Sequence, residues 1–156
     1  MKQLIKSKAA FLLATCTFIL LLSSGFISRP GGEGFEVYIN HKLVLQQFGK
    51  DINTTKSISL ANAKPDEEVL VKYHRCGNGS NNRVFTIRDG QDKILKQWAY
   101  KNTTEKISLM TCKVKDITSL QQGSNNTFKL YYSSSEIPNG RLLASLVLAS
   151  AETAHK

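Results

Sequence analysis

Three side chains able to bind metals or undergo redox chemistry, His74, Cys76 and Cys112, are the first candidates for a functional site. His74 and Cys76 stand two residues apart, so on a β-strand both project from one face, about 6.5 to 7 Å apart along the chain. Imidazole and thiolate ligands suit copper(I) or zinc, and Met110 would share a face with Cys112 if that segment is extended. The ligand types of a soft metal site are therefore present, although no Cys-x-x-Cys pair accompanies them.

The same two cysteines also fit a disulfide. The third cysteine, Cys16, lies in an N-terminal apolar run, so an exported domain would keep the pair Cys76 and Cys112. Closing that loop of 36 residues would stabilise the fold by ~3 to 4 kcal/mol on the chain-entropy model. Free cysteines are also common core residues. We therefore favour the disulfide, keep core cysteines as the alternative, and place the metal site behind both.

Trp98 and Tyr100 are candidates for a different site, a glycan-stacking platform. On a strand they share a face with Ile94 and Lys96, and a mixed face of this kind is compatible with an exposed platform. In sheet proteins, however, such aromatics more often form the core and cross-strand pairs. We therefore expect a structural role for both and keep glycan binding as an alternative.

No motif in the sequence indicates catalysis. There is no nucleophile elbow, no His-Glu-x-x-His, no Gly-rich phosphate loop and no calcium loop. The densest acidic run, Asp66-Glu67-Glu68, fits a solvated loop, and Asp89-Gly90-Gln91-Asp92 fits a hairpin turn. We predict that the chain is not an enzyme, with no catalytic residues and no cofactor.

The charge of the chain restricts its partners. The sequence has 21 Lys and Arg against 12 Asp and Glu, and removing three N-terminal lysines leaves 18 against 12, a net charge of +6. The cations, Arg83 and Arg88 among them, are scattered singly, whereas nucleic-acid binders concentrate them on a stripe with interleaved aromatics. We expect a solvated charged surface and no nucleic-acid partner, with weak attraction to anionic envelope polymers as the alternative.

Residues 1–25 have the composition of a secretory signal peptide. Three lysines precede an uncharged apolar run over residues 9–22, and a short run of small residues ends at Gly25. This predicts cleavage after Gly25 and export to the periplasm, the cell surface or the medium. The uncharged run continues to Ser28, long enough to cross a bilayer, so an uncleaved signal anchor is the alternative and the only membrane contact that we expect.

Period-two alternation recurs through the rest of the chain, and no stretch of 12 or more residues shows a helical stripe. With turn signals between the alternating runs, this predicts an all-β fold, an antiparallel β-sandwich of roughly eight to nine short strands, with a small barrel as the alternative. The domain spans 35–150, between a flexible lead at 26–34 and a disordered tail at 151–156. The expected strands cover 35–39, 43–48, 56–60, 69–76, 84–87, 94–100, 106–114, 127–133 and 141–149.

The last of these strands is ambiguous, because the apolar positions of 141–149 also fit a helical stripe. A turn predicted at Ile137-Pro138-Asn139-Gly140 and the short remaining length favour a strand. Four Asn-x-Ser/Thr sequons fall in predicted loops, where the preference of Asn, Ser, Thr and Gly for turns explains them without glycosylation. These are Asn53, Asn78, Asn102 and Asn125.

Four segments of the exported part resemble those of small exported all-β proteins of Bacteroidetes that have no assigned function. The segments are 73–77 (YHRCG), 112–117 (CKVKDI), 130–134 (LYYSS) and 140–145 (GRLLAS). The resemblance implies a bacterial envelope location and brings no site residues with it.

Together these features predict an exported, non-catalytic β-sandwich that is an interaction or structural component of a bacterial envelope. Its partner would be an envelope protein or a surface polymer. The alternatives are a metal-binding or redox protein using His74, Cys76 and Cys112, and a glycan-binding module using Trp98 and Tyr100.

Overall fold

The computed structural model describes residues 32–75, 77 and 79–148. Nearly all of the regular structure in these residues is β-strand, as the alternation predicts. The strands are β1 (Gly34–Ile39), β2 (Lys42–Phe48), β3 (Ser57–Ser59), β4 (Glu68–His74), β5 (Arg83–Arg88), β6 (Ile94–Tyr100), β7 (Ile107–Lys113), β8 (Thr127–Ser134) and β9 (Ile137–Val147). A 3-10 turn, η2 (Gly49–Asn53), and a short helix, α2 (Val114–Thr118), complete the described elements.

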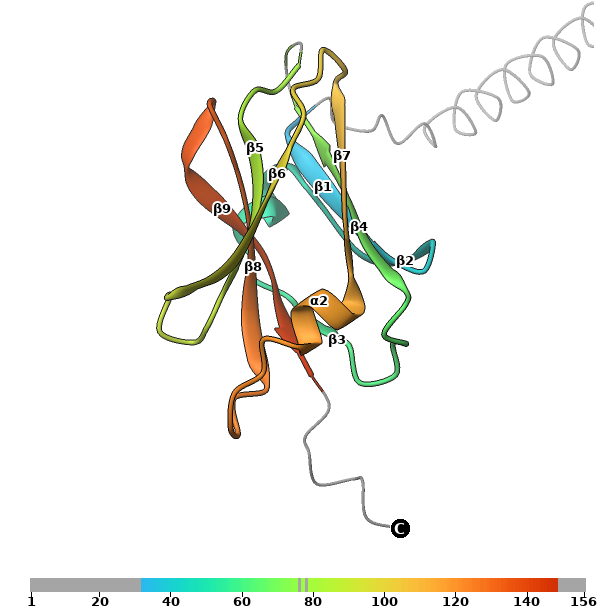
Figure 1. Ribbon diagram of the computed structural model, residues 1–156. Helices are drawn as coiled ribbons and strands as arrows, with labels where there is room; N and C mark the ends of the chain where they lie inside the picture. Colours follow the sequence, from blue (N-terminus) through green and yellow to red (C-terminus); the bar gives the residue numbers. More distant parts are fainter. Residues whose placement is uncertain (1–31, 76, 78, 149–156) are drawn as a thin grey trace, which may run out of the picture. The chain divides into compact units, whose positions relative to one another are not determined.

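The strands form two separate sheets, which confirms the sandwich and not the barrel (Figure 1). The four-stranded sheet has the order β2-β1-β4-β7 and is antiparallel throughout. The five-stranded sheet has the order β3-β9-β8-β5-β6 and is mixed, because β3 pairs in parallel with β9. The expectation of a purely antiparallel sandwich is therefore corrected at this one edge.

The core lies between the sheets and is filled by every second residue of the inner strands. On β4 these are Val69, Val71 and Tyr73, each fully buried, and the Tyr73 ring stacks on that of Tyr132 in β8 with centroids 4.3 Å apart. Burying one side chain of this size stabilises a fold by about 1.5–3 kcal/mol. The period-two pattern of the sequence arises because every second residue of a strand faces this core.

The C-terminal segment is a strand, as expected, but it begins earlier than predicted. β9 starts at Ile137, and the chain reverses at Ser135 and Glu136, so the turn predicted at 137–140 is wrong. The pairing of β8 with β9 is irregular at this point, and Gly140 has φ 74°. Because β3 pairs only with residues 145–147 of β9, the strand has an open side at Pro138, where the missing N–H is tolerated.

Two local features were not expected. Val114 and Ile117 anchor α2 to the core, at the end of the strand predicted over 106–114. Glu33 and Gly34, assigned above to the flexible lead, are fixed in the structure. Gly34 belongs to β1, and Glu33 accepts a hydrogen bond from the Tyr73 hydroxyl at 2.6 Å.

The predicted signal peptide (1–25), most of the predicted lead (26–34) and the predicted tail (151–156) lie outside the described residues. Within the described part, no helix is both long enough and apolar enough to span a bilayer.

Candidate functional site

The strand register separates the metal-ligand candidates instead of gathering them. His74 pairs with Ile107 at one end of the β4–β7 ladder, whereas Cys112 pairs with Val69 near the other. The two pairs are five residue steps apart, roughly 17 Å along the strands. Cys76 lies outside the described residues, and among the described ones no group of three or more His, Cys, Asp and Glu side chains could hold a metal ion. His74 and Cys112 therefore do not belong to one site.

Cys112 is a free, buried thiol, 6% exposed, on the inner face of β7. Burial raises its pKa to about 12, with a further contribution from the Asp116 carboxylate. Because the thiolate is the reactive form of cysteine, this environment makes Cys112 inert in the folded protein. Its described position is that of a core cysteine, the second of the roles considered above, while the proposed disulfide partner lies outside the described residues.

We predict that Cys112 reacts with iodoacetamide at neutral pH at least a hundred-fold more slowly in the native protein than after unfolding. Mass spectrometry of the peptide containing Cys112, with and without denaturant, measures the ratio. Comparable labelling in both states would contradict the buried thiol, and an unlabelled Cys112 peptide after non-reducing denaturation would instead support the disulfide.

Trp98 and Tyr100 do not form an open platform. Both are half-buried and pack against the core at the β6 edge of the five-stranded sheet. Lys96 lies over the Trp98 ring, 4.9 Å from its centroid, and the Tyr100 ring meets Phe85 edge to face at 5.5 Å. The Tyr100 hydroxyl donates to the carbonyl oxygen of Thr111 in β7. The structural role expected for these aromatics is therefore the one that they have.

The Arg83 side chain, like that of Tyr100, reaches from the five-stranded sheet to β7. The expectation that all the cations are solvated is therefore wrong for this residue. It is 6% exposed. Its Nε donates to the Lys101 carbonyl oxygen at 2.9 Å, and its Nη1 donates to the Leu109 carbonyl oxygen at 3.2 Å. Together Arg83 and Tyr100 connect the five-stranded sheet to the edge of β7 through two of its carbonyl groups.

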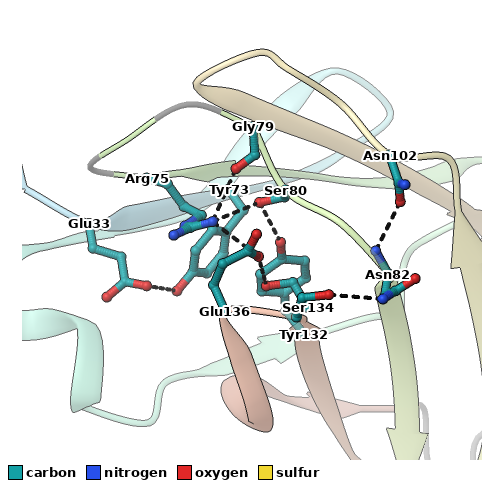
Figure 2. Close-up of polar contacts among 11 residues, drawn as sticks. Glu33, Tyr73, Arg75, Gly79, Ser80, Asn82, Asn102, Tyr132, Ser134 and Glu136 are labelled. Carbon is teal, nitrogen blue, oxygen red and sulfur yellow. Dashed lines mark hydrogen bonds and ion pairs between the residues drawn. The ribbon is translucent and has the colours of Figure 1, made fainter.

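A cluster of polar side chains closes one end of the sandwich (Figure 2). We call it the polar end cluster: Glu33, Tyr73, Arg75, Ser80, Tyr132, Ser134 and Glu136. The Tyr132 hydroxyl donates to Ser80 Oγ at 3.3 Å, and Arg75 Nη1 donates to the Gly79 carbonyl oxygen at 3.0 Å. Arg75 also pairs with Glu136 at 3.0 Å, which ties the segment after β4 to the turn between β8 and β9.

The chemistry of the polar end cluster is that of a structural closure. Burial, together with the hydrogen bond to Glu33, raises the pKa of Tyr73. The Ser134 hydroxyl, with the nearby Arg75 guanidinium, holds the pKa of the Glu136 carboxyl below its usual range. Glu33 is itself paired with Arg141 at 2.9 Å. Tyr73 is therefore held in its protonated form and Glu136 in its ionised form, so neither is poised as a nucleophile or a base near neutral pH.

A cleft of about 390 Å³ opens at the turn between β1 and β2. Part of its polar lining is internally paired: the side chain of Asn40 and the backbone N–H of Lys64 both donate to the Glu67 carboxylate. Lys113 lies 3.8 Å from Glu68. These contacts engage Asn40, Glu67, Glu68 and Lys113, and the side chains of His41, Lys64 and Asp66 complete the polar lining.

The outer face of the four-stranded sheet is the remaining candidate. It consists of the outward residues of four strands: Leu43, Gln46 and Phe48 of β2, Glu36 and Tyr38 of β1, Glu68, Leu70, Lys72 and His74 of β4, and Ile107, Leu109, Thr111 and Lys113 of β7. An antiparallel sheet with one solvated face normally carries polar side chains there. Here β7 instead presents Ile107 at 42% and Leu109 at 55% exposure.

A polar group occupies the centre of this outer face. The Tyr38 hydroxyl donates to Glu36 Oε2 at 2.6 Å, and the Gln46 side-chain amide donates to Glu36 Oε1 at 3.3 Å. Lys72 Nζ lies 4.6 Å from the centroid of the Tyr38 ring. The His74 imidazole is 3.7 Å from Glu36 Oε1. These contacts fix the acid Glu36 and the base Lys72 on neighbouring strands in the middle of the sheet.

Apolar side chains flank that polar centre along both edge strands. Of the five large apolar side chains that are exposed in the described residues, four lie on these edges: Leu43, Val44, Ile107 and Leu109. Phe48 packs on His74 with ring centroids 5.1 Å apart and covers Gly34, where any Cβ would collide with its ring. A side chain at position 34 would therefore displace the Phe48 ring from its place over the sheet.

Sequence reasoning did not single out this outer face, although the sequence contains a signal for it. In Ile107-Ser108-Leu109-Met110 both alternating sets are apolar or small, so either face could have been the inner one. An apolar residue on each side of a strand is the pattern of a strand covered on both faces.

Comparisons with known proteins add no assignment. No protein-family model matches the chain, and no curated protein matches it.

Proposed function

We propose that this chain is an exported β-sandwich without catalytic activity that binds another protein through the outer face of its four-stranded sheet. The observation that carries the proposal is the exposure of Leu109 and Ile107 on the outside of β7, 55% and 42%. Contiguous exposed apolar side chains with a polar surround mark interaction sites in soluble proteins.

The inner side of β7 makes this exposure informative. The strand buries Ser108, Met110 and Cys112, while its largest aliphatic side chains face outward. Folding alone would favour the opposite arrangement, because burying an aliphatic side chain stabilises a protein by about 1.5–3 kcal/mol. An outward Leu and Ile on one strand are explained when a second surface covers them.

The charge of the outer face favours a protein partner over an anionic polymer. Its charged side chains are two acids and two bases, namely Glu36, Glu68, Lys72 and Lys113, and these form two cross-strand pairs. A surface that attracts polyanions carries an excess of cations, whereas a balanced polar group among apolar residues is the composition of a protein interface.

The two alternative functions receive less support. The metal or redox function needs His74 and Cys112 in one site, and the register of β4 with β7 keeps them five residue pairs apart. The glycan platform needs an open Trp98 ring, which Lys96 partly covers.

Export is part of this proposal and rests on residues 1–25, with their lysines, apolar run and small residues. The compartment is therefore the periplasm, the cell surface or the medium of a bacterium.

Capture from the native envelope tests the proposed interface. Tagged wild-type chain, Leu109→Asp and the control Ile94→Asp are produced in the source bacterium, and co-purified proteins are identified by mass spectrometry. Ile94 matches Leu109 in exposure, at 49%, but belongs to the other sheet. We expect the proteins captured by the wild type to be retained by Ile94→Asp and lost with Leu109→Asp, because a charge in an apolar contact is costly. Equal capture by all three chains would refute the interface.

A further inference from the structure

We infer that the partner at this outer face is a second copy of the chain, packed face to face about a two-fold axis that runs parallel to the strands between β1 and β4. The inference rests on the proposed function and identifies its partner. β1 and β4 are the central strands of the sheet, and β2 and β7 are its edges. Such an axis therefore lays β1 of one copy over β4 of the other, and β2 over β7.

The register of the sheet makes the polar centre self-complementary under this axis. Glu36 and Lys72 are cross-strand partners and lie in the same row of the sheet. The two-fold consequently places Glu36 of each copy opposite Lys72 of the other, and symmetry produces this pair twice. An axis perpendicular to the strands would instead bring Glu36 onto Glu36 and Lys72 onto Lys72.

At the edges, the central row places Leu109 opposite Gln46, and the apolar side chains face each other in the neighbouring rows. In the neighbouring row, Phe48 pairs with Gly34, Gly34 with His74, and His74 with Ile107. Phe48 of one copy then lies opposite Ile107 of the other. Gly34 lies opposite His74, and because the Phe48 ring covers this glycine, the imidazole of one copy meets that ring of the other.

The row on the other side of the polar centre behaves likewise. Leu43 pairs with Tyr38, Tyr38 with Leu70, and Leu70 with Thr111. Across the axis, Tyr38 therefore faces Leu70, and Leu43 faces the methyl-bearing side chain of Thr111. None of these three rows brings like charges together.

The overall charge of the chain supports this surface for self-association. Outside residues 1–25 the sequence carries a net charge of +6, so two copies repel each other over most of their surface. The outer face is charge-balanced, because Glu36 and Glu68 offset Lys72 and Lys113. It is a part of the surface on which two cationic copies meet without that repulsion.

The size of the face sets the strength of the association. Four strands about 4.8 Å apart and six or seven residues long form a face of roughly 20 by 22 Å. That is roughly 440 Å² in projection, less than the ~800 Å² per partner of a standard stable interface. We therefore expect a dimer in concentration-dependent exchange with the monomer.

Charge exchange tests both the dimer and its symmetry. Sedimentation velocity of the purified exported chain is recorded from about 1 µM to about 500 µM, a range that covers weak interfaces. The wild type is expected to shift from monomer to dimer. Glu36→Lys and Lys72→Glu should each raise the dimer dissociation constant at least ten-fold, because each variant alone brings two pairs of like charges together. An equimolar mixture of the two variants should dimerise again, since the two-fold then pairs opposite charges at both positions.

The mixture also controls for folding, because neither variant could recover in it if the substitution had damaged the sheet. A wild type that stays monomeric, a single variant that still dimerises, or a mixture that does not recover would overturn the two-fold dimer. The proposed function is judged separately: loss of a different captured protein with Leu109→Asp, combined with a monomeric wild type, would keep the interface and replace its partner.

Discussion

Replacing Arg83 by methionine is expected to lower the free energy of unfolding by about 3 kcal/mol, because hydrogen bonds to charged groups each contribute about 1.5–3 kcal/mol. The guanidinium donates to the carbonyl oxygens of Lys101 and Leu109 from a position that is 6% exposed. Methionine fills a similar volume but donates nothing, so both carbonyls lose their partner. The corresponding fall in Tm is about 10 °C for a domain of this size.

Arg88→Met is the matched control, since Arg88 lies on the same strand and stacks over the Tyr131 ring at 4.5 Å without crossing to the other sheet. Its loss should cost less than about 1 kcal/mol, the scale of a cation–π contact at an accessible site. Urea unfolding of the three proteins measures the difference. Equal destabilisation by both substitutions would show that the bridge from Arg83 to β7 adds nothing to stability.

Arg83 also illustrates what the sequence could not provide. Its neighbours, Val84-Phe85-Thr86-Ile87, predict a strand correctly from their alternation. Whether the arginine at its start faces water or the other sheet depends on which strand passes opposite, and the nearest one, β7, is more than 20 residues away in sequence. A lone cation carries no periodic signal, so its burial could not be inferred.

The strands themselves were predictable because each belongs to one of two packed sheets. One face of each strand is therefore buried, and this imposes a period of two on the sequence. The errors fall where that period is interrupted, or where an element is too short to show a period of its own. Pro138-Asn139-Gly140 has the composition of a turn, yet it lies inside β9, where the pairing with β8 is irregular. At α2, five residues are too few to show the helical period.

The candidate site depended on register, which the sequence does not encode locally. The alternation correctly places His74 on one face of its strand, but Cys112 could be opposite any residue of β4. Antiparallel pairing with Val69 moves it to the far end of the ladder. The outer face was overlooked for the same reason: Ile107 and Leu109 count as core candidates until the structure shows that Met110 and Cys112 occupy the inner side.

Alkaline pH is expected to destabilise the protein from about pH 9 upward, through Cys112. Burial raises the pKa of this thiol from 9.0 to about 12. Above pH 9 the unfolded chain therefore ionises while the folded chain keeps its proton, and stability falls as pH rises. The loss approaches 1.4 kcal/mol per pH unit and ends near the folded pKa. Tyr73 and Tyr100, whose pKa values burial also raises, add to the loss above pH 10.

Cys112→Ala separates the thiol from the tyrosines. At pH 7 the variant should be less stable than the wild type by about 1 kcal/mol, because it loses one buried sulfur. Between about pH 9 and pH 10 the free energy of unfolding of the wild type should fall by about 1 kcal/mol more than that of the variant, so the two curves converge. Urea unfolding at several pH values records both curves. Parallel curves would mean that Cys112 gains no acidity on unfolding, as in a chain that holds this sulfur in a disulfide in both states.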